Sequence, residues 1–230
     1  MTTKLHPPGD ALRVVLLDID GTLIDSNDAH ARAWVCALAE HGYVVQFDEV
    51  RPLIGMGGDK LLPILVGLDS DSAEAERIGE SRGALFRKEL PALRPTKGAR
   101  DLLEFLTSEG LELVVATSAQ AEEVSAILQQ AGVADLIQAA ASADDADNSK
   151  PDPDIVQAAL RKAHRFAAHS LLIGDTPYDI DAGAAARVPT IALRCGGWWS
   201  DVALSNALAI YDDPADLRRN FDSSPLNVRA

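Results

Sequence analysis

Cysteine is scarce in this sequence, and long apolar runs are missing from it. Cys36 and Cys195 are the two cysteines among 230 residues, and they lie far apart. This spacing excludes a disulfide framework and a CxxC metal site, and it predicts two reduced thiols. Residues 1–10 hold charges and prolines rather than the apolar core of a signal peptide. No later stretch has the apolar length of a membrane span, so we predict a cytoplasmic protein with no membrane partner.

Positive charge is also in short supply. Lys and Arg number 21 against 35 Asp and Glu, which gives a formal net charge of −14. A nucleic-acid binder needs clusters of Lys and Arg for the phosphate backbone, so we predict no nucleic-acid partner. A small phosphorylated substrate is compatible with this charge, because a metal ion and a few local cations can reverse the field inside one pocket.

Short apolar runs rich in β-branched residues recur along the chain and are typical of buried strands. Between them, apolar residues repeat at the i, i+3, i+4, i+7 spacing of one helical face, as in Ala99, Leu102, Leu103 and Leu106. Buried strands that alternate with such helices predict an α/β fold with a doubly wound parallel sheet. The predicted strands are residues 13–17, 112–116, 170–174 and 189–193, with weaker candidates at 136–140 and 208–211.

The alternation stops between residues 26 and 95, which hold helical stripes but no convincing strand. A segment of this length directly after the first strand is too long for a loop. We therefore predict a catalytic core of residues 1–25 and 96–230 and an inserted helical subdomain of residues 26–95. The polar tail, residues 220–230, is expected to fray. The sequence is compatible with a monomer and with a homodimer.

Several polar residues lie at the ends of the predicted strands or just after them. In a doubly wound sheet, ligands bind beyond the carboxyl ends of the strands. Each of these residues alone is ordinarily a helix cap, a turn residue or a surface charge. Their convergence on one edge of the sheet predicts an active site, formed by Asp18, Asp20, Thr117, Ser118, Lys150, Asp175 and Asp179.

These residues give the chain a resemblance to the haloacid dehalogenase superfamily. Its phosphatases carry a D-x-D-G-T motif, a Ser or Thr after a second strand, a Lys and a G-D-x-x-x-D motif. Here the motifs are residues 18–22 (DIDGT), Thr117, Lys150 and residues 174–179 (GDTPYD). Residues 26–95 resemble the helical cap of the phosphoglycolate phosphatase and β-phosphoglucomutase branch. The resemblance covers essentially the whole chain and implies a Mg²⁺-dependent phosphatase that acts on a small phosphorylated metabolite.

The resemblance implies that Asp18 is a nucleophile that forms an aspartyl-phosphate and that Asp20 is the general acid and base. Asp20 has to be protonated for the first step, which burial and nearby negative charge are expected to favour. Asp18 and Asp175 suit Mg²⁺, which prefers oxygen ligands, and family analogy adds the backbone carbonyl of Asp20. Asp179 is expected to bind the ion directly, to bind it through water or to position Asp175.

Other residues are expected to bind the phosphoryl group and the rest of the substrate. Thr117 would donate a hydrogen bond to a phosphoryl oxygen, and Lys150 would pair with the phosphoryl group and with Asp18. Backbone N–H groups at Thr22 and Ser118 would add further contacts to phosphate.

Residues of the helical segment are candidates for contacts with the leaving group. His30 would reach the leaving group or couple closure of the cap to Asp20, and a half-buried structural histidine is an equal alternative. Residues 51–60 are expected to form a specificity loop. In it, Gly57 allows close backbone approach to a ligand or marks a bend between helices. Arg51 and Lys60 are candidates for binding a second anionic group of the substrate, or are plain surface charges.

Two other functions fit part of this pattern. A β-phosphoglucomutase-like enzyme would return the phosphoryl group to its substrate, but such mutases carry an Arg in the specificity loop where Gly58 stands here. A phospho-accepting receiver domain also places a strand-end Asp near Mg²⁺ and a Lys, but it is much shorter and has no cap. The dehalogenase and phosphonatase branches lack an Asp two residues after the nucleophile, so Asp20 favours phosphoryl transfer.

Overall fold

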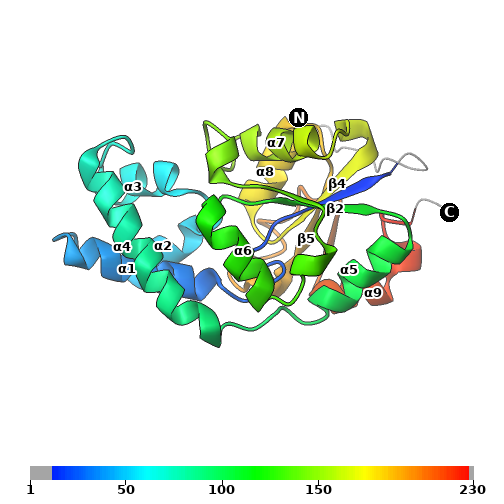
Figure 1. Cartoon of the computed structure of the whole chain (residues 1–230), viewed down its shortest axis with the longest axis horizontal. Coiled ribbons are helices and arrows are strands. Elements are labelled where there is room, and N and C mark those ends of the chain that lie inside the picture. The colour runs from blue at the N-terminus through cyan, green and yellow to red at the C-terminus, as the bar shows by residue number, and fades with distance from the viewer. Residues whose placement is uncertain (1–11, 228–230) are drawn as a thin grey trace.

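The computed structural model describes residues 12–227, and residues 1–10, on which the expectation about a signal peptide rests, lie outside this range. Six parallel strands form one sheet in the order β3-β2-β1-β4-β5-β6. Figure 1 shows helices on both faces of the sheet and a further group of helices to one side. The strands are β1 (Val14–Leu17), β2 (Glu112–Ala116), β3 (Ala139–Ala141), β4 (Ser170–Gly174), β5 (Thr190–Leu193) and β6 (Ala209–Tyr211).

Strand β1 lies in the middle of the sheet, and its register brings three strand ends to one edge. Leu17 is paired with Val115 of β2 and with Ile173 of β4. All four residues of β1 are buried, as expected for a parallel sheet that is covered on both faces. The residues that follow β1, β2 and β4 therefore emerge side by side.

The side chains of β1 alternate between two hydrophobic cores. On one face, Val15 and Leu17 share a core with helices α5 (Ala99–Ser108), α6 (Ala121–Gln130) and α9 (Pro214–Arg219). On the other face, Val14 and Leu16 share a core with α7 (Asp154–Lys162) and α8 (Pro177–Ala185). This arrangement confirms the predicted doubly wound α/β sheet.

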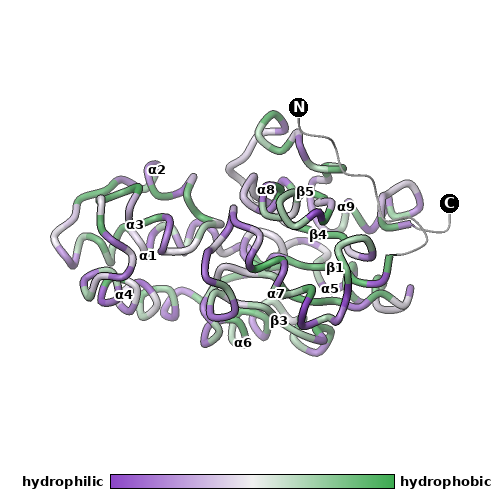
Figure 2. The backbone as a smooth tube through the Cα atoms, turned by 90° about the horizontal axis from the view of Figure 1, so that it is seen from above, coloured by the Kyte–Doolittle hydropathy of each residue, from purple (hydrophilic) through white to green (hydrophobic). Residues whose placement is uncertain are grey.

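The predicted cap, residues 26–95, is helical. It contains α1 (Asn27–Glu40), α2 (Phe47–Val50), α3 (Gly58–Val66) and α4 (Ala73–Glu89). Viewed from above, these helices lie beside the sheet, and α1 packs along α4 (Figure 2). The cap has a small hydrophobic core of its own, which includes Trp34, Leu38, Val50, Leu61 and Ile78. The residues of this core face one another, whereas Ala29 and Ala33 of α1 and Phe86 of α4 pack into a core that they share with the sheet.

Two sequence-based expectations need correction. The weak strand candidate at 136–140 begins later, at Ala139, because a 3₁₀ turn at Ala134–Leu136 precedes it. The tail does not fray over its described part, because Phe221 packs edge-on against Phe105, with ring centroids 4.7 Å apart, and Leu226 is only 1% exposed. Residues 228–230 of that tail lie outside the described range. Two apolar anchors in a polar segment are enough to hold it.

Within residues 12–227, every helix is too short or too polar to cross a membrane.

Candidate active site

A small cavity lies where the cap meets the carboxyl edge of the sheet. Asp18 follows β1 and Thr117 follows β2, and the backbone N–H of Asp18 donates to the carbonyl oxygen of Ile173 at 2.9 Å. The strand pairing thus continues into the catalytic loop and holds Asp18 in place. The cavity has a volume of about 60 Å³, and its lining from the sheet side includes Asp18, Asp20, Thr117, Ser118 and Glu123.

Lys150 is completely buried and joins two of the predicted carboxylates. Its Nζ lies 2.6 Å from Oδ1 of Asp18 and 2.7 Å from Oδ1 of Asp179. Burial lowers the pKa of Lys150, but the charges of Asp179 and Asp18 raise it above its ordinary value. The amine is therefore protonated, and it supplies a positive charge directly beside the Asp18 carboxylate.

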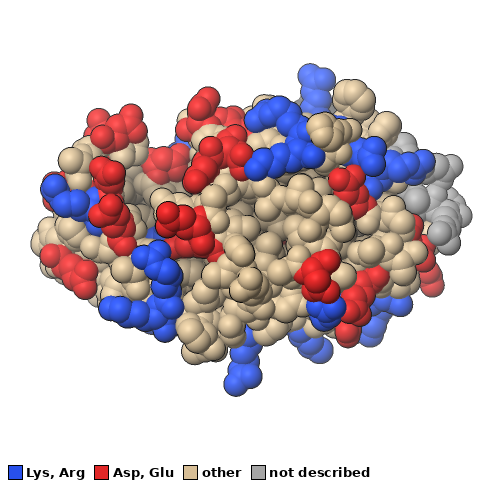
Figure 3. Space-filling view, viewed as in Figure 1, with Lys and Arg blue, Asp and Glu red and all other residues tan. Residues whose placement is uncertain are grey.

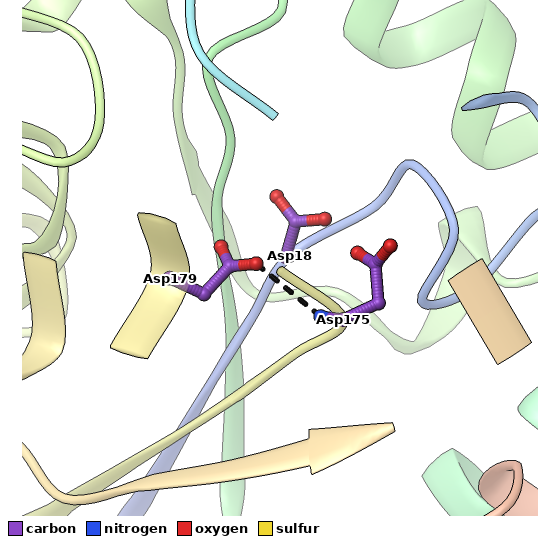
Figure 4. Close-up of side chains that lie close together, drawn as sticks. All are labelled: Asp18, Asp175 and Asp179. Atoms are coloured by element: carbon purple, nitrogen blue, oxygen red, sulfur yellow. Dashed lines mark hydrogen bonds between the residues drawn. The ribbon is translucent and has the colours of Figure 1, made fainter. Parts of the chain in front are cut away.

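Three buried carboxylates converge at this point. Carboxylate oxygens of Asp18, Asp175 and Asp179 lie within 4.8 Å of one another (Figure 4). The pKa of Asp18 is raised to about 7, mainly because the carboxyl group is buried. Lys150 acts against this and lowers the pKa, whereas the charges of Asp179 and Asp20 raise it. Burial and the charges of Asp179 and Asp18 also raise the pKa of Asp175 well above its ordinary value. Three carboxylates against one Lys leave negative charge uncompensated, and this oxygen-only donor set fits a Mg²⁺ ion.

Asp175 and Asp179 are held differently within this cluster. Oδ1 of Asp175 accepts a hydrogen bond from Thr22 Oγ1 at 3.2 Å, and Oδ2 accepts one from Asn27 Nδ2 at 2.8 Å. Asp179 uses Oδ1 for Lys150, and its Oδ2 accepts from the backbone N–H groups of Asp175 and Thr176 and from the Thr176 hydroxyl. Figure 4 shows the bond to the N–H of Asp175 as a dashed line. Asp179 thus orients both Lys150 and the loop that carries Asp175.

Two glycines make room for Asp175. Gly21 has φ +75°, in the left-handed region, and a Cβ there would collide with Asn27 Nδ2 and with the Asp175 carboxylate. A Cβ on Gly196 would also overlap the Asp175 carboxylate. A side chain at either position would displace Asp175, and at Gly21 it would also strain the turn after Asp20.

Two residues of the cap hold the Asp20 carboxylate in place. Its Oδ1 lies 2.5 Å from the Ser26 hydroxyl and 2.9 Å from His30 Nε2. The His30 ring stacks on Phe86 of α4, with ring centroids 3.8 Å apart. Burial raises the pKa of Asp20, but His30, Ser26 and Arg82 outweigh this and lower it. The expectation that burial and negative charge favour protonated Asp20 is therefore wrong, because the imidazole and the hydroxyl stabilise the carboxylate.

Thr117 and Ser118 lie on the sheet side of the cavity. Thr117 is buried, and its Oγ1 accepts a hydrogen bond from the backbone N–H of Ala119 at 3.1 Å. The Oγ atom of Ser118 is buried and has no hydrogen-bond partner among the described residues. Both hydroxyls can therefore still donate a hydrogen bond to a ligand in the cavity.

The structure brings some of the other predicted residues to the cavity and holds others away from it. His30 and Gly57 line the cavity, whereas the side chain of Thr22 is bonded to Asp175 and its backbone N–H donates to Ile19. Arg51 is buried elsewhere: it donates to Asp28 Oδ1 at 2.6 Å and to the carbonyl oxygen of Gly196.

Lys60 forms an ion pair between the cap and the sheet domain, because its Nζ lies 2.6 Å from Asp152 Oδ2. Gly57 makes a second contact between the cap and the sheet domain, a hydrogen bond from its backbone N–H to Ser149 Oγ at 3.0 Å. The loop 51–60 therefore contacts the sheet domain directly and closes one side of the cavity.

Several residues at the site were not predicted from the sequence, among them Ser26, whose hydroxyl contacts Asp20. Asn27 holds Asp175, and Arg82 of α4 pairs with Glu123 of α6 in the wall of the cavity. A charged residue on an amphipathic helix is ordinarily solvated, so the sequence carried no signal for Arg82 or Glu123. Their burial depends on how the cap docks onto the sheet domain.

A doubly wound sheet with a lysine and clustered carboxylates at its strand ends, closed by a helical cap, defines an enzyme that acts on an anionic group. A model of the haloacid dehalogenase-like hydrolases matches residues 15–193, which is most of the chain. The chain belongs to this family, and the predicted resemblance is confirmed.

Named relatives and solved structures resemble the chain along nearly its whole length. The phosphoglycolate phosphatase of Rhodospirillum rubrum is 30% identical over 215 residues, which cover 89% of this chain and 89% of that protein. The N-acetylmuramic acid 6-phosphate phosphatase of Pseudomonas aeruginosa is 28% identical over 212 residues, with coverage of 87% and 94%. The crystal structure of a hydrolase from Pseudomonas syringae matches with a TM-score of 0.85 at 28% identity, over 92% and 98% of the two chains.

Proposed function

We propose that the protein is a Mg²⁺-dependent phosphatase that hydrolyses a small phosphorylated metabolite through an aspartyl-phosphate on Asp18. The observation that carries this proposal is the contrast between two carboxylates two residues apart. Asp18 is bound to the Lys150 ammonium, whereas Asp20 is bound to the Ser26 hydroxyl and the His30 imidazole. One carboxylate is thus placed beside a cation and the other beside a proton carrier, as nucleophilic and acid–base roles require. Both named relatives are phosphatases.

In the first step, a carboxylate oxygen of Asp18 attacks phosphorus and the bond to the leaving oxygen breaks. The leaving oxygen takes a proton from Asp20. His30 Nε2 lies 2.9 Å from Asp20 Oδ1, so a proton held by His30 can pass to Asp20 as the leaving group departs. This shared proton explains how a carboxylate with a lowered pKa can serve as an acid.

In the second step, water attacks the phosphorus of the aspartyl-phosphate and the bond to Asp18 breaks. Asp20, now ionised, accepts the proton of the attacking water, and inorganic phosphate leaves. Lys150 stays beside Asp18 through both steps and stabilises negative charge on the transferring group. The Thr117 and Ser118 hydroxyls would donate to phosphoryl oxygens from the sheet side.

Asp18 and Asp175 would hold the Mg²⁺ ion, with the backbone carbonyl of Asp20 as a further ligand. When bound, the ion supplies positive charge that neutralises the phosphoryl oxygens. Asp179 would act by orienting the loop of Asp175 and Lys150, because its two oxygens already accept four hydrogen bonds from protein groups, against two at Asp175. Thr22 and Asn27 would keep the Asp175 carboxylate in position for the ion.

The test is release of inorganic phosphate from phenyl phosphate with Mg²⁺ and with EDTA, for the wild type and for Asp18→Asn. We expect turnover that needs Mg²⁺ and that the variant lacks. Acid-quenched wild type should carry one extra phosphoryl group by mass spectrometry, and Asp18→Asn should not. Asp101→Asn is the control, because Asp101 is exposed on α5 and loses the same charge away from the cavity.

Two results would contradict the proposal. Turnover retained by Asp18→Asn would show that Asp18 is not the nucleophile. A folded wild type that forms the phosphoryl-enzyme but releases no phosphate would indicate a phosphomutase, which returns the phosphoryl group to its substrate.

A further inference from the structure

One wall of the cavity contains a buried ion pair between the cap and the sheet domain. Arg82 of α4 is 8% exposed and Glu123 of α6 is 3% exposed. Nη1 of Arg82 lies 2.8 Å and 3.1 Å from the two oxygens of Glu123. The guanidinium also lies over the Trp34 ring, 5.6 Å from its centroid. All three residues line the cavity that holds Asp20.

The ion pair with Glu123 does not satisfy every hydrogen-bond donor of Arg82. Both hydrogen bonds to Glu123 come from Nη1, and Nε is buried with no hydrogen-bond partner among the described residues. A buried N–H donor without an acceptor is unfavourable, so a missing acceptor is expected. The buried Ser118 Oγ, which lines the same cavity, has no partner among these residues either. Ser118 Oγ can serve the phosphoryl group, and Arg82 Nε remains as a donor for the rest of the ligand.

The charge of this wall is balanced, and the space beyond it is acidic. Glu123 neutralises Arg82 inside the cavity. An adjoining cleft of about 650 Å³ shares Trp34, Arg82 and Ser118 with the cavity, and Arg82 is the one cation among its described lining residues. Acidic side chains gather where the cap faces α6 and α7 (Figure 3). The carboxylates that line this cleft belong to Asp59, Glu76, Glu80, Glu122, Asp144 and Asp147.

We propose that Arg82 and Glu123 select phosphomonoesters whose leaving group is an uncharged hydroxyl compound, and that they disfavour a second phosphate or a carboxylate. Nε of Arg82 donates to a hydroxyl oxygen of the leaving group, and a Glu123 oxygen accepts the hydroxyl proton. An anionic leaving group would bring a further negative charge beside Glu123 and into the acidic cleft, with Arg82 already neutralised. This inference rests on the proposed phosphatase function and names the substrate class of the same site.

The test uses two esters of equal size that differ in one group. Phosphoglycolate carries a carboxylate where 2-hydroxyethyl phosphate carries a hydroxymethyl group. We expect the wild type with Mg²⁺ to have a kcat/KM at least tenfold higher for 2-hydroxyethyl phosphate. In Glu123→Gln, which keeps an acceptor but removes the negative charge, kcat/KM for phosphoglycolate should rise at least tenfold. The ratio of kcat/KM for 2-hydroxyethyl phosphate to kcat/KM for phosphoglycolate should therefore fall at least tenfold relative to the wild type.

A second variant separates hydrogen bonding from charge. Arg82→Lys keeps the charge but loses the planar donor edge. We expect its kcat/KM for 2-hydroxyethyl phosphate to fall at least tenfold more than its kcat/KM for phenyl phosphate, which has no hydroxyl on its leaving group. Asp101→Asn, which removes one negative charge on α5, should leave both ratios unchanged.

The proposal is overturned if the wild type prefers phosphoglycolate, or if Glu123→Gln folds and leaves the preference unchanged. The wild-type preference is decisive even if Glu123→Gln fails to fold. Absence of phosphate release from phenyl phosphate as well would overturn the proposed phosphatase function and this inference with it. Phenyl phosphate turnover without the expected preference would overturn the inference alone.

Discussion

The two sides of the cavity differ in how the chain builds them. The floor is formed by Asp18 and Thr117 of the sheet domain, where Lys150 and Asp175 lie next to Asp18. The roof, formed by His30, Trp34 and Arg82, comes from the cap. The floor follows from strand register, because residues after adjacent parallel strands must meet. The roof forms only where separate helices dock onto the sheet domain. The same fold can therefore keep the chemistry of the floor while the roof changes selectivity.

The two sides also differ in electrostatics. On the floor, three buried carboxylates share one lysine, so negative charge is in excess and a bound cation is favoured. On the roof, Arg82 is neutralised by Glu123, and the His30 imidazole is hydrogen-bonded to Asp20. We therefore expect changes on the floor to abolish activity and changes on the roof to redirect or slow it.

The largest effect is expected from Lys150→Met on the floor. The substitution leaves Asp18 and Asp179 as buried carboxylates without their cation, which should lower the free energy of unfolding by about 3–5 kcal/mol. Phosphate release should fall at least about 10²-fold because the transferring group loses a fixed positive charge. Chemical denaturation and phosphate release measure the two effects. Lys97→Met, at an exposed position, is the control, and equal effects in both variants would contradict this role of Lys150.

A smaller effect is expected from His30→Gln on the roof. Glutamine can still donate a hydrogen bond to Asp20 but cannot carry a proton to it. We expect kcat for an alkyl phosphate to fall about 10²-fold, and kcat for p-nitrophenyl phosphate to change little because that leaving group departs without a proton. Equal losses on both esters would show that His30 only positions Asp20. His41→Gln, in which the replaced imidazole contacts Ser81, is the matched control.

The affinity for Mg²⁺ should depend on pH because carboxyl groups of the floor titrate. Burial raises the pKa of Asp18 to about 7, so below pH 7 the ion has to displace a proton. The apparent affinity should therefore rise with pH toward pH 7, by about tenfold per pH unit for each proton displaced, and Asp175, whose pKa is also raised, adds to this rise. Titration calorimetry from pH 5.5 to pH 8.5 measures this, and a flat profile would contradict it.

The raised pKa of Asp18 also affects the metal-free protein, whose stability should fall with rising pH whereas its affinity for Mg²⁺ should rise. The pKa of Asp18 is raised in the folded state above its ordinary value, so the folded state binds more protons between about pH 4 and pH 7. Stability in EDTA should therefore fall as pH rises through this window. Asp18→Asn removes the titrating group, and its melting temperature should decline less over the same range.

The smallest effect is expected from Lys60→Met at the rim. The ion pair between Lys60 and Asp152 is partly exposed, with the side chains 31% and 44% accessible, so its contribution should be at most about 1 kcal/mol. We expect kcat/KM to change by less than twofold. A loss of tenfold or more would instead show that Lys60 leaves Asp152 and binds the substrate, which is one of the two roles considered for it.

The floor could be predicted from the sequence almost completely. The apolar runs before Asp18, Thr117 and Asp175 become β1, β2 and β4, and the parallel register of these strands brings the three residues together. Lys150 could be placed only through the family motif, because it lies in a loop that no periodicity locates. The pKa of Asp20 was predicted in the wrong direction because the hydrogen bonds from Ser26 and His30 depend on the geometry at the start of α1.

The roof was largely beyond prediction. The helical stripe of α1 indicated a helix, and Trp34 was part of that stripe, but the docking of α4 against α6 left no local signal. Arg82 and Glu123 are separated by 41 residues and look like ordinary surface charges until the cap is in place. Arg51 was a candidate for binding the substrate because of its charge. In the structure, its guanidinium instead donates a hydrogen bond to the carbonyl oxygen of Gly196.

Asn27 is the first residue of the cap helix α1, yet its amide donates to Asp175 and to the carbonyl oxygen of Gly196. If α1 rotates with the cap, opening withdraws this amide from a carboxylate that would bind the metal ion. Ion affinity and cap position are then energetically coupled, and the coupling is reciprocal: closure tightens the ion, and the ion favours closure. A metal-loaded enzyme would thus already be biased toward the closed form when its substrate arrives.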